Sequence, residues 1–144
     1  MTTDTPLLDL LRQTVGAPHV LTEGDLTAYE QDWRRRVRGR ALAVVRPGST
    51  AEVAAVVRAC AAHGVAIVPQ SGNTGLSVGS VPDDSGTQLL LNLGRLDRVR
   101  AIDRANLTLT AEAGCVLQRL QAAAQDAGLL YPLSLGSEGS CMLG

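Results

Sequence analysis

The feature that most constrains the fold is a strand, helix and strand pattern between Ala41 and Pro69. The apolar run Ala-Leu-Ala-Val-Val that begins at Ala41 is typical of a buried strand. A capping box, Ser49-Thr50-Ala51-Glu52, predicts the start of a helix that Gly64 ends. The apolar run over residues 65–68 predicts the next strand. The sequence therefore predicts one β-α-β unit, with a loop following its second strand.

That loop is rich in glycine and small polar residues. It reads Pro69-Gln70-Ser71-Gly72-Asn73-Thr74-Gly75-Leu76-Ser77-Val78-Gly79-Ser80. Glycine allows positive φ and lets successive backbone N–H groups converge on one point, while hydroxyl and amide side chains add further donors. The pattern favours a phosphate or pyrophosphate cradle, although an ordinary surface turn accounts equally well for the glycine content.

The loop matches neither of two common phosphate motifs. A P-loop ends in Gly-Lys-Ser/Thr, whereas this chain has no lysine and its 13 basic residues are all arginine. The dinucleotide fingerprint Gly-x-Gly-x-x-Gly does not fit the glycine spacing, and the stretch from Pro82 to Gly86 does not continue as a helix. The predicted cradle is therefore of another kind.

Helix and strand patterns on both sides of this unit indicate a single domain of mixed α/β (α+β) class. A helix is expected over residues 6–15 with Thr5 as its cap, and a second short helix after Thr22, where residues 22–25 resemble a capping box. Beyond the loop we expect strands over residues 88–93, 99–103 and 107–113, a helix over residues 116–127 closed by Gly128, and a second loop rich in Gly and Ser over residues 129–144.

Composition limits the function classes. The chain is 45% hydrophobic but has no Phe, so we expect an aliphatic core. A net charge of -1 gives no general attraction to nucleic acid or membranes, and no apolar run approaches the roughly 20 residues of a membrane span. The start lacks the pattern of a signal peptide, and the widely spaced Cys60, Cys115 and Cys141 suggest neither a disulfide framework nor a zinc site. A cytoplasmic protein is expected.

Several motifs follow one another along the chain, namely Asp32-Trp33, residues 45–50, residues 69–76, residues 79–82, Ala113-Gly114, Pro132-Leu133 and residues 136–144. In this order they resemble the vanillyl-alcohol-oxidase (PCMH) type of FAD-binding fold. Within that fold the chain is most similar to the D-2-hydroxyacid dehydrogenase group, which includes D-2-hydroxyglutarate dehydrogenase, flavin-linked D-lactate dehydrogenase and the glycolate oxidase FAD subunit. The resemblance covers the chain from about residue 22 onward.

The resemblance implies FAD as cofactor and gives positions to the residues that contact it. In the family the first loop wraps the pyrophosphate through backbone N–H groups, which implies this role for Gln70, Ser71, Gly72, Asn73, Thr74, Gly75 and Leu76, with Ser80 nearby. From the second loop, the residues implied to approach the flavin or ribityl group are Pro132, Leu133, Gly139, Ser140 and Gly144. Ser71 and Val78 stand where the family usually has glycine, and Val78 resists positive φ.

The same resemblance implies the reaction and the domain limits. Residues 1–40 are expected as a helical lead-in and residues 41–144 as part of the FAD-binding domain. The implied activity is hydride transfer from a D-2-hydroxy acid, namely D-2-hydroxyglutarate, D-lactate or glycolate, to the flavin. The substrate-binding arginine, metal-binding histidines and proton-accepting base belong to later parts of family members, so no catalytic or metal-binding residue is assigned here. The electron acceptor and a homodimer stay open. The alternative is a truncated, non-catalytic chain that acts as a weak nucleotide-binding or structural module.

Other candidate residues favour plainer interpretations. The run Arg34, Arg35, Arg36, Arg38 and Arg40 suggests phosphate or nucleic-acid binding, but without interleaved aromatics a solvated or interdomain surface is favoured. His19 and His63 have no second ligand at metal spacing. Cys141, in the second loop, is left open as a point of covalent flavin attachment.

Overall fold

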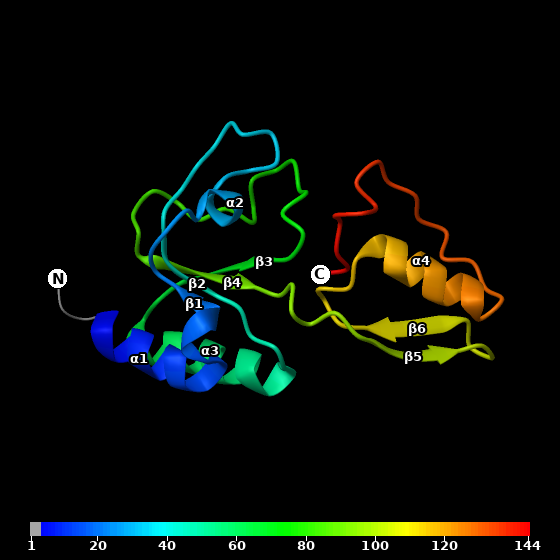
Figure 1. Cartoon of the computed structure of the whole chain (residues 1–144), viewed down its shortest axis with the longest axis horizontal. Coiled ribbons are helices and arrows are strands. Elements are labelled where there is room, and N and C mark those ends of the chain that lie inside the picture. The colour runs from blue at the N-terminus through cyan, green and yellow to red at the C-terminus, as the bar shows by residue number, and fades with distance from the viewer. Residues whose placement is uncertain (1–3) are drawn as a thin grey trace.

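A four-stranded mixed sheet organises the first part of the chain (Figure 1). In the computed structural model, which describes residues 4–144, its strand order is β1-β2-β4-β3. β1 runs antiparallel to β2, whereas β2, β4 and β3 are parallel to one another. β4 thus lies between the two strands of the predicted β-α-β unit. The strands are β1 (Val20–Leu21), β2 (Ala41–Val45), β3 (Ile67–Gln70) and β4 (Gln88–Asn92).

Two helices cover one face of this sheet, α1 (Asp4–Val15) and α3 (Thr50–His63) (Figure 1). They bury an aliphatic core against β2 and β4, as the composition predicts. Its buried members are Leu7, Leu11, Val15, Val20, Ala43, Val45, Val56, Ala59, Cys60, Leu89 and Leu91. Because α1 contributes to the same core as β2 and β4, the lead-in expected over residues 1–40 packs together with the domain that follows it.

The ends of α3 follow the predicted signals. Ser49 Oγ accepts a hydrogen bond from the backbone N–H of Glu52 at 3.2 Å, as an N-cap residue does. The Glu52 carboxylate reaches back to the N–H of Gly48 at 2.8 Å rather than to that of Ser49. Gly64 ends the helix with φ 65°, a left-handed conformation that favours glycine.

Two predictions near the N-terminus are wrong in detail. Thr5 lies inside α1 instead of capping it, since the helix includes Asp4. The second short helix, α2 (Thr27–Glu30), is present but begins later than the capping box at residues 22–25 indicates, because Gly24 has φ 89° and interrupts helical geometry there. The Asp25 carboxylate accepts the N–H of Thr27 at 3.0 Å.

The opposite face of the sheet carries α2 and the loop that follows β3 (Figure 1). A smaller cluster of Ala41, Val44 and Leu90 is buried there. Leu26 and Tyr29, which flank and belong to α2, pack against it. The short 3-10 helix η1 (Ala17–His19) links α1 to β1. The loop after β3 therefore rests on a sheet that is packed on both faces.

The second part of the chain contains the hairpin of β5 (Val99–Asp103) and β6 (Thr108–Ala111), and α4 (Leu117–Asp126). Gly128 follows α4 with φ 72°, as expected of a helix stop. Residues 129–144 contain no helix or strand in the structure, but Met142 forms an isolated antiparallel bridge with Val116. The predicted mixed α/β class is confirmed, with strand ends shifted by a few residues. None of the described helices has both the length and the apolar character needed to cross a membrane.

Candidate functional site

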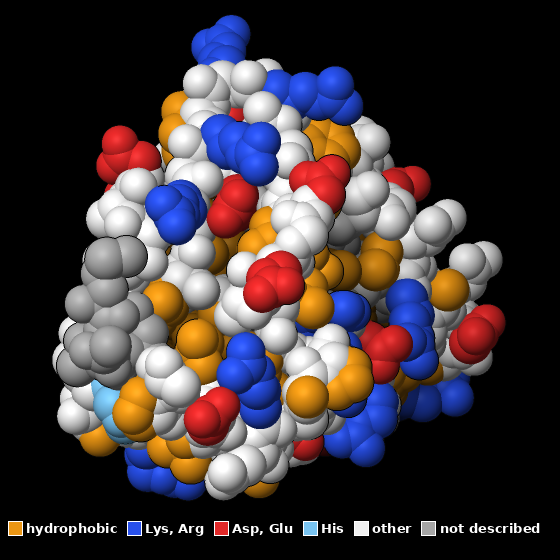
Figure 2. Space-filling model, turned by 60° about the vertical axis from the view of Figure 1, so that its left-hand side comes forward, with side chains coloured by type: hydrophobic (Ala, Val, Ile, Leu, Met, Phe, Trp, Pro, Cys, Tyr) orange, Lys and Arg blue, Asp and Glu red, His pale blue; other side chains and the backbone are white. Residues whose placement is uncertain are grey.

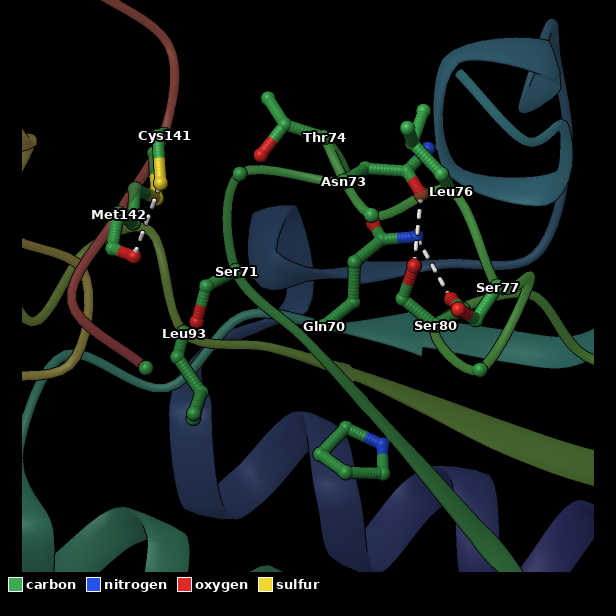
Figure 3. A pocket seen from close by; sticks show the side chains of 15 residues that line it. Gln70, Ser71, Asn73, Thr74, Leu76, Ser77, Ser80, Leu93, Cys141 and Met142 are labelled. Carbon is green, nitrogen blue, oxygen red and sulfur yellow. Dashed lines mark hydrogen bonds between the residues drawn. The ribbon is translucent and has the colours of Figure 1, made fainter. Parts of the chain in front are cut away.

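The glycine-rich loop lines a pocket at the end of β3. Parallel strands direct their carboxyl ends to the same edge, where ligands commonly bind in open α/β sheets. The pocket has a volume of about 420 Å³. Most of its lining comes from the loop, and the rest from the end of β4 and the C-terminal segment (Figure 3). Its lining residues are Pro69, Gln70, Ser71, Gly72, Asn73, Thr74, Gly75, Leu76, Ser77, Gly79, Ser80, Leu93, Cys141, Met142 and Gly144.

The Gln70 side chain holds the base of the loop. It is buried, with 3% of its surface exposed. Its Nε2 donates to the carbonyl oxygens of Tyr29, at 2.8 Å, and Ser80, at 2.9 Å, and its Oε1 accepts from Asn92 Nδ2 at 3.3 Å. The amide therefore ties the start of the loop to its end, to α2 and to β4. A buried amide with all these partners is a positioning group.

Asn73 fixes the middle of the loop in the same way. Its Nδ2 donates to the carbonyl oxygens of Gln31, at 2.8 Å, and Ala28, at 3.3 Å. Its Oδ1 accepts from Ser80 Oγ at 2.8 Å. Figure 3 shows Gln70, Asn73 and Ser80 turned toward one another on one side of the pocket. The loop is thus shaped by side-chain amides rather than by its own backbone hydrogen bonds.

As a result, the loop backbone keeps its donors free. Within the described chain, no backbone N–H from Ser71 to Ser80 donates a hydrogen bond to the protein. Positive φ occurs at Asn73 (50°) and Val78 (66°), and not at Gly72, Gly75 or Gly79. The expectation that these glycines supply the positive φ is therefore wrong. At Asn73 the hydrogen bonds of the side-chain amide hold the backbone in that region. Runs of free N–H groups around such residues form anion-binding nests.

Gly72 serves a different purpose, close approach of the C-terminal segment. A Cβ on Gly72 would collide with the carbonyl oxygen of Ser140, so only glycine fits there. Gly144 is equally confined, since its Cβ would meet Ala113 at 2.6 Å and Ser71 Oγ at 3.1 Å. Backbone bonds from Leu143 to Cys115 (2.9 Å) and from Gly144 to Ala113 (2.8 Å) hold the segment in place. The two glycine-rich loops therefore meet at this pocket.

The structure brings most of the residues in the expected FAD site together and leaves others apart. Gln70 to Leu76, Ser80 and Gly144 line the pocket. Ser140 borders it through its backbone contact with Gly72. Pro132 and Leu133 line a separate hollow beside α4. Gly139 is near Gln118 of α4 and does not line the pocket.

Sequence reasoning did not assign several residues to the site. Leu93 and Met142 line the pocket, and Cys141, which was considered only for covalent attachment, lines it too. Asn92 and the segment from Ala28 to Gln31 hold the loop from outside. A buried polar residue at the end of an apolar strand, as in Leu-Leu-Leu-Asn92, is the one signal that could have found Asn92.

The chemistry of this pocket suits an anion with several oxygens. None of its lining side chains carries a charge, so no acidic side chain opposes an anion and no basic side chain fixes it. Free backbone N–H groups are then the dominant donors, joined by the hydroxyls of Ser71, Thr74 and Ser77. A pyrophosphate fits this donor set. The described residues contain no cluster of three His, Cys, Asp or Glu side chains that could hold a metal ion.

Comparisons with known proteins agree with this geometry. Residues 41–144 match the family described as FAD binding domain. The D-2-hydroxyglutarate dehydrogenase of Xanthomonas citri pv. viticola is 42% identical over 140 residues, covering 96% of this chain and 29% of that protein. The enzyme of the same name from Stutzerimonas stutzeri is 35% identical over 143 residues, covering 99% of this chain and 30% of that protein. The chain thus spans less than a third of these relatives.

A solved structure of alkyldihydroxyacetonephosphate synthase superimposes with a TM-score of 0.83 over 97% of this chain and 28% of that one, at 18% identity. At this identity the likeness shows the fold alone. It agrees with the fold type that the sequence motifs indicate.

Proposed function

The chain belongs to the FAD binding domain family, and we propose that its loop from Gln70 to Ser80 holds the pyrophosphate of FAD. The observation that carries the proposal is the row of backbone N–H groups from Ser71 to Ser80 that have no acceptor in the described protein. Such donors are costly to leave without a partner once a pocket closes, so they favour a ligand rich in oxygen.

Each part of the loop has a separate task in this proposal. Gln70 and Asn73 hold the backbone in shape through bonds to α2 and Ser80, so the cradle is formed before the ligand arrives. Gly72 lets the C-terminal segment approach, which places Cys141 and Met142 opposite the loop. The pyrophosphate charge is then met by dipoles alone, as in other backbone nests.

We propose that this domain serves a protein that oxidises a D-2-hydroxy acid. The similarity to two D-2-hydroxyglutarate dehydrogenases over almost the whole chain supports this class. When bound, the flavin of FAD supplies the acceptor for the hydride of the hydroxy acid. The residues described here bind and orient the cofactor, and no group that accepts a proton is assigned among them. D-lactate and glycolate remain within the proposed substrate class because they share the 2-hydroxycarboxylate group.

The cellular setting is also a proposal. The thiols of Cys60, Cys115 and Cys141 are unpaired, which supports a reducing compartment such as the cytoplasm. A homodimer stays a proposal as well, and no electron acceptor is assigned.

The test is FAD binding by the chain with a matched pair of glycine variants. A Cβ on Gly75 or on Gly136 would meet no protein atom within 4 Å, and neither residue has positive φ, so Gly75→Val and Gly136→Val should both fold. Only Gly75 lines the pocket. Titration of FAD, followed by quenching of flavin fluorescence, should show binding that Gly75→Val weakens about tenfold or more, with no change for Gly136→Val.

Two results would contradict the proposal. If the chain retains no flavin after incubation with excess FAD, the cradle does not hold the cofactor, and the alternative of a structural module gains support. If Gly75→Val binds FAD as tightly as the unchanged chain, the ligand lies elsewhere. Circular dichroism of both variants checks that the fold is intact.

A further inference from the structure

A second pocket shares a wall with the cradle and has no role in the proposal so far. Its volume is about 610 Å³. Gly72 and Asn73 line both pockets, so these two residues form part of the wall between them. The remaining lining residues of the second pocket come from α2 and from the turn after it, Thr27, Ala28, Gln31, Asp32, Trp33 and Arg35.

The turn that forms the outer wall, residues 31–38, is held rigidly by Asp32. Its carboxylate accepts backbone N–H groups from Arg36 and Val37, both at 2.6 Å, and from Arg34 at 3.0 Å. These bonds, that of Val37 first, hold the pKa of Asp32 below its ordinary value. The base of the turn is closed by the bond from Asp32 N to Val37 O and by the bridge between Gln31 and Arg38. The Asp32 carboxylate and these backbone bonds together hold the tip.

Most of this tip is exposed to solvent, including every residue from 33 to 38. Trp33, the one tryptophan of the chain, is 53% exposed, although an indole is among the side chains that gain most from burial. Arg35 is held at φ 57°, an uncommon conformation for a residue other than glycine, and also lines the pocket. Backbone geometry of this kind, kept at an exposed tip, is common at ligand sites.

The tip is also basic. In residues 4–144, Arg34, Arg35 and Arg36 form no ion pair, whereas Arg38 lies 3.5 Å from Glu30. Asp32, the acid of the pocket, is already occupied by three N–H groups. Figure 2 shows arginine side chains gathered at the end of the molecule where Figure 1 places this turn. The pocket therefore offers a flat aromatic surface and an unpaired guanidinium beside an anion cradle.

We propose that this second pocket is a stacking subsite for a flat heteroaromatic ring attached to the pyrophosphate in the cradle, with Trp33 as the platform. The inference rests on the proposed FAD site. FAD carries two such rings, adenine and isoalloxazine, one on each side of its pyrophosphate. Base-aromatic stacking tolerates either ring, since each has a π-face. Arg35 adds a positive charge that favours a ligand bearing phosphate.

The test uses the tryptophan itself as the probe. Acrylamide quenching of Trp33 fluorescence is measured in the chain alone and with saturating FAD, ADP or FMN. Stacking should shield the indole, so quenching should fall when the ring lies on it. Shielding by ADP assigns the adenine, and shielding by FMN assigns the isoalloxazine. ADP also separates contact from energy transfer, because adenine does not absorb the indole emission.

Affinity gives the second readout. Trp33→Ala should weaken FAD binding about 5- to 150-fold, whereas Trp33→Phe, which keeps a ring, should lose less. Arg35→Gln should weaken binding, and Arg34→Gln, which removes an equal charge outside the pocket, serves as the matched control. Unchanged melting temperatures of the Trp33 variants would show that the loss is not one of folding.

The outcomes separate this inference from the proposed function. If FAD binds but Trp33 is not shielded and Trp33→Ala binds as tightly as the unchanged chain, the subsite is wrong while the cradle stands. If none of the three nucleotides binds, both fall together.

Discussion

The two parts of the chain are packed to very different degrees. The sheet region, residues 4–96, contains most of the large side chains that are fully buried, among them Leu7, Leu11, Leu89 and Leu90. The C-terminal region, residues 97–144, contributes Leu120 and Cys115 to that set. Exposed large apolar side chains number five in each region, so they are about twice as frequent in the shorter C-terminal one, where they are Leu107, Leu130, Leu133, Leu135 and Leu143, with Leu130 at 83% exposure.

The difference bears directly on the pocket. One wall, the loop after β3, stands on the four-stranded sheet, whereas the opposite wall of Cys141, Met142 and Gly144 belongs to the C-terminal region. A two-stranded hairpin is marginally stable by itself, and here it packs against α4. The loop side of the cradle therefore stands on the region with the larger buried core, and its closure depends on the region with the smaller one.

The largest expected effect comes from matched core truncations. Leu89→Ala, in the sheet core, should lower the free energy of unfolding by about 2–5 kcal/mol, because it removes a fully buried side chain beside rigid neighbours. Leu120→Ala removes the same group from α4. It should speed hydrogen exchange in α4 while leaving the urea transition seen by Trp33 fluorescence almost unchanged. Equal shifts of that transition in both variants would show that the two regions unfold as one unit.

A smaller effect is expected at the base of the loop. Gln70→Met keeps the volume but removes the donor for the carbonyl oxygens of Tyr29 and Ser80, at a cost of about 1–3 kcal/mol for the buried group left unpaired. It should also weaken FAD binding, because the cradle loses its preformed shape. Urea unfolding and flavin titration measure the two effects. Gln125→Met, on the exposed side of α4, is the control and should change neither.

Local signals in the sequence predicted the sheet region well. The strand from Ala41, the N-cap Ser49 and the stop at Gly64 depend on neighbours within a few residues, so pattern alone could locate them. The site depends on contacts across long stretches of chain. Gln70 bonds to Tyr29 over 41 residues, and that separation leaves no periodic trace in the sequence. The same holds for the collision that makes Gly72 necessary, since Ser140 lies far along the chain.

The expectation about positive φ failed for a related reason. Glycine marks where such backbone is tolerated, whereas side-chain bonds decide where it occurs, as Asn73 shows. The strand expected over residues 107–113 does not include Leu107, which has φ 54° and is 73% exposed. Both residues lie where turn geometry prevails over the hydrophobic pattern.

As the pH falls, the C-terminal region should lose stability before the sheet region does. Hydrogen bonds from Arg98, with help from Arg100, lower the pKa of Glu112 from 4.5 to about 2. A carboxyl whose pKa is lower in the folded state stabilises the fold above its unfolded pKa, and that stability is lost as the pH falls from 4.5 toward 2. Glu112→Gln cannot ionise, so its stability should vary less with pH over this window.

Hydrogen exchange of β5 and β6, measured at about pH 6 and again at about pH 3, gives the readout for this prediction. The difference in hydrogen-exchange rate of these strands between the unchanged chain and Glu112→Gln should shrink as the pH falls. Other acids with lowered pKa, such as Asp32 and Asp103, affect both proteins alike and cancel in the comparison. A constant difference at both pH values would contradict the role given to Glu112.

The smallest expected effect concerns the backbone strain at Val78, in the loop that forms the cradle. Val78 has φ 66°, and a β-branched residue in this conformation costs about 1–3 kcal/mol. Val78→Gly removes that cost but adds about 0.5–1 kcal/mol of chain entropy to the unfolded state, so a net gain of about 1 kcal/mol is expected. Val78→Ala is the control, because it deletes the branch and keeps a Cβ in the left-handed region. The melting temperature should be highest for Val78→Gly, lower for Val78→Ala and lowest for the unchanged chain. The reverse order would mean that Val78 gains more from its contacts than its φ costs, and the loop would then owe its shape to packing as well as to Gln70 and Asn73.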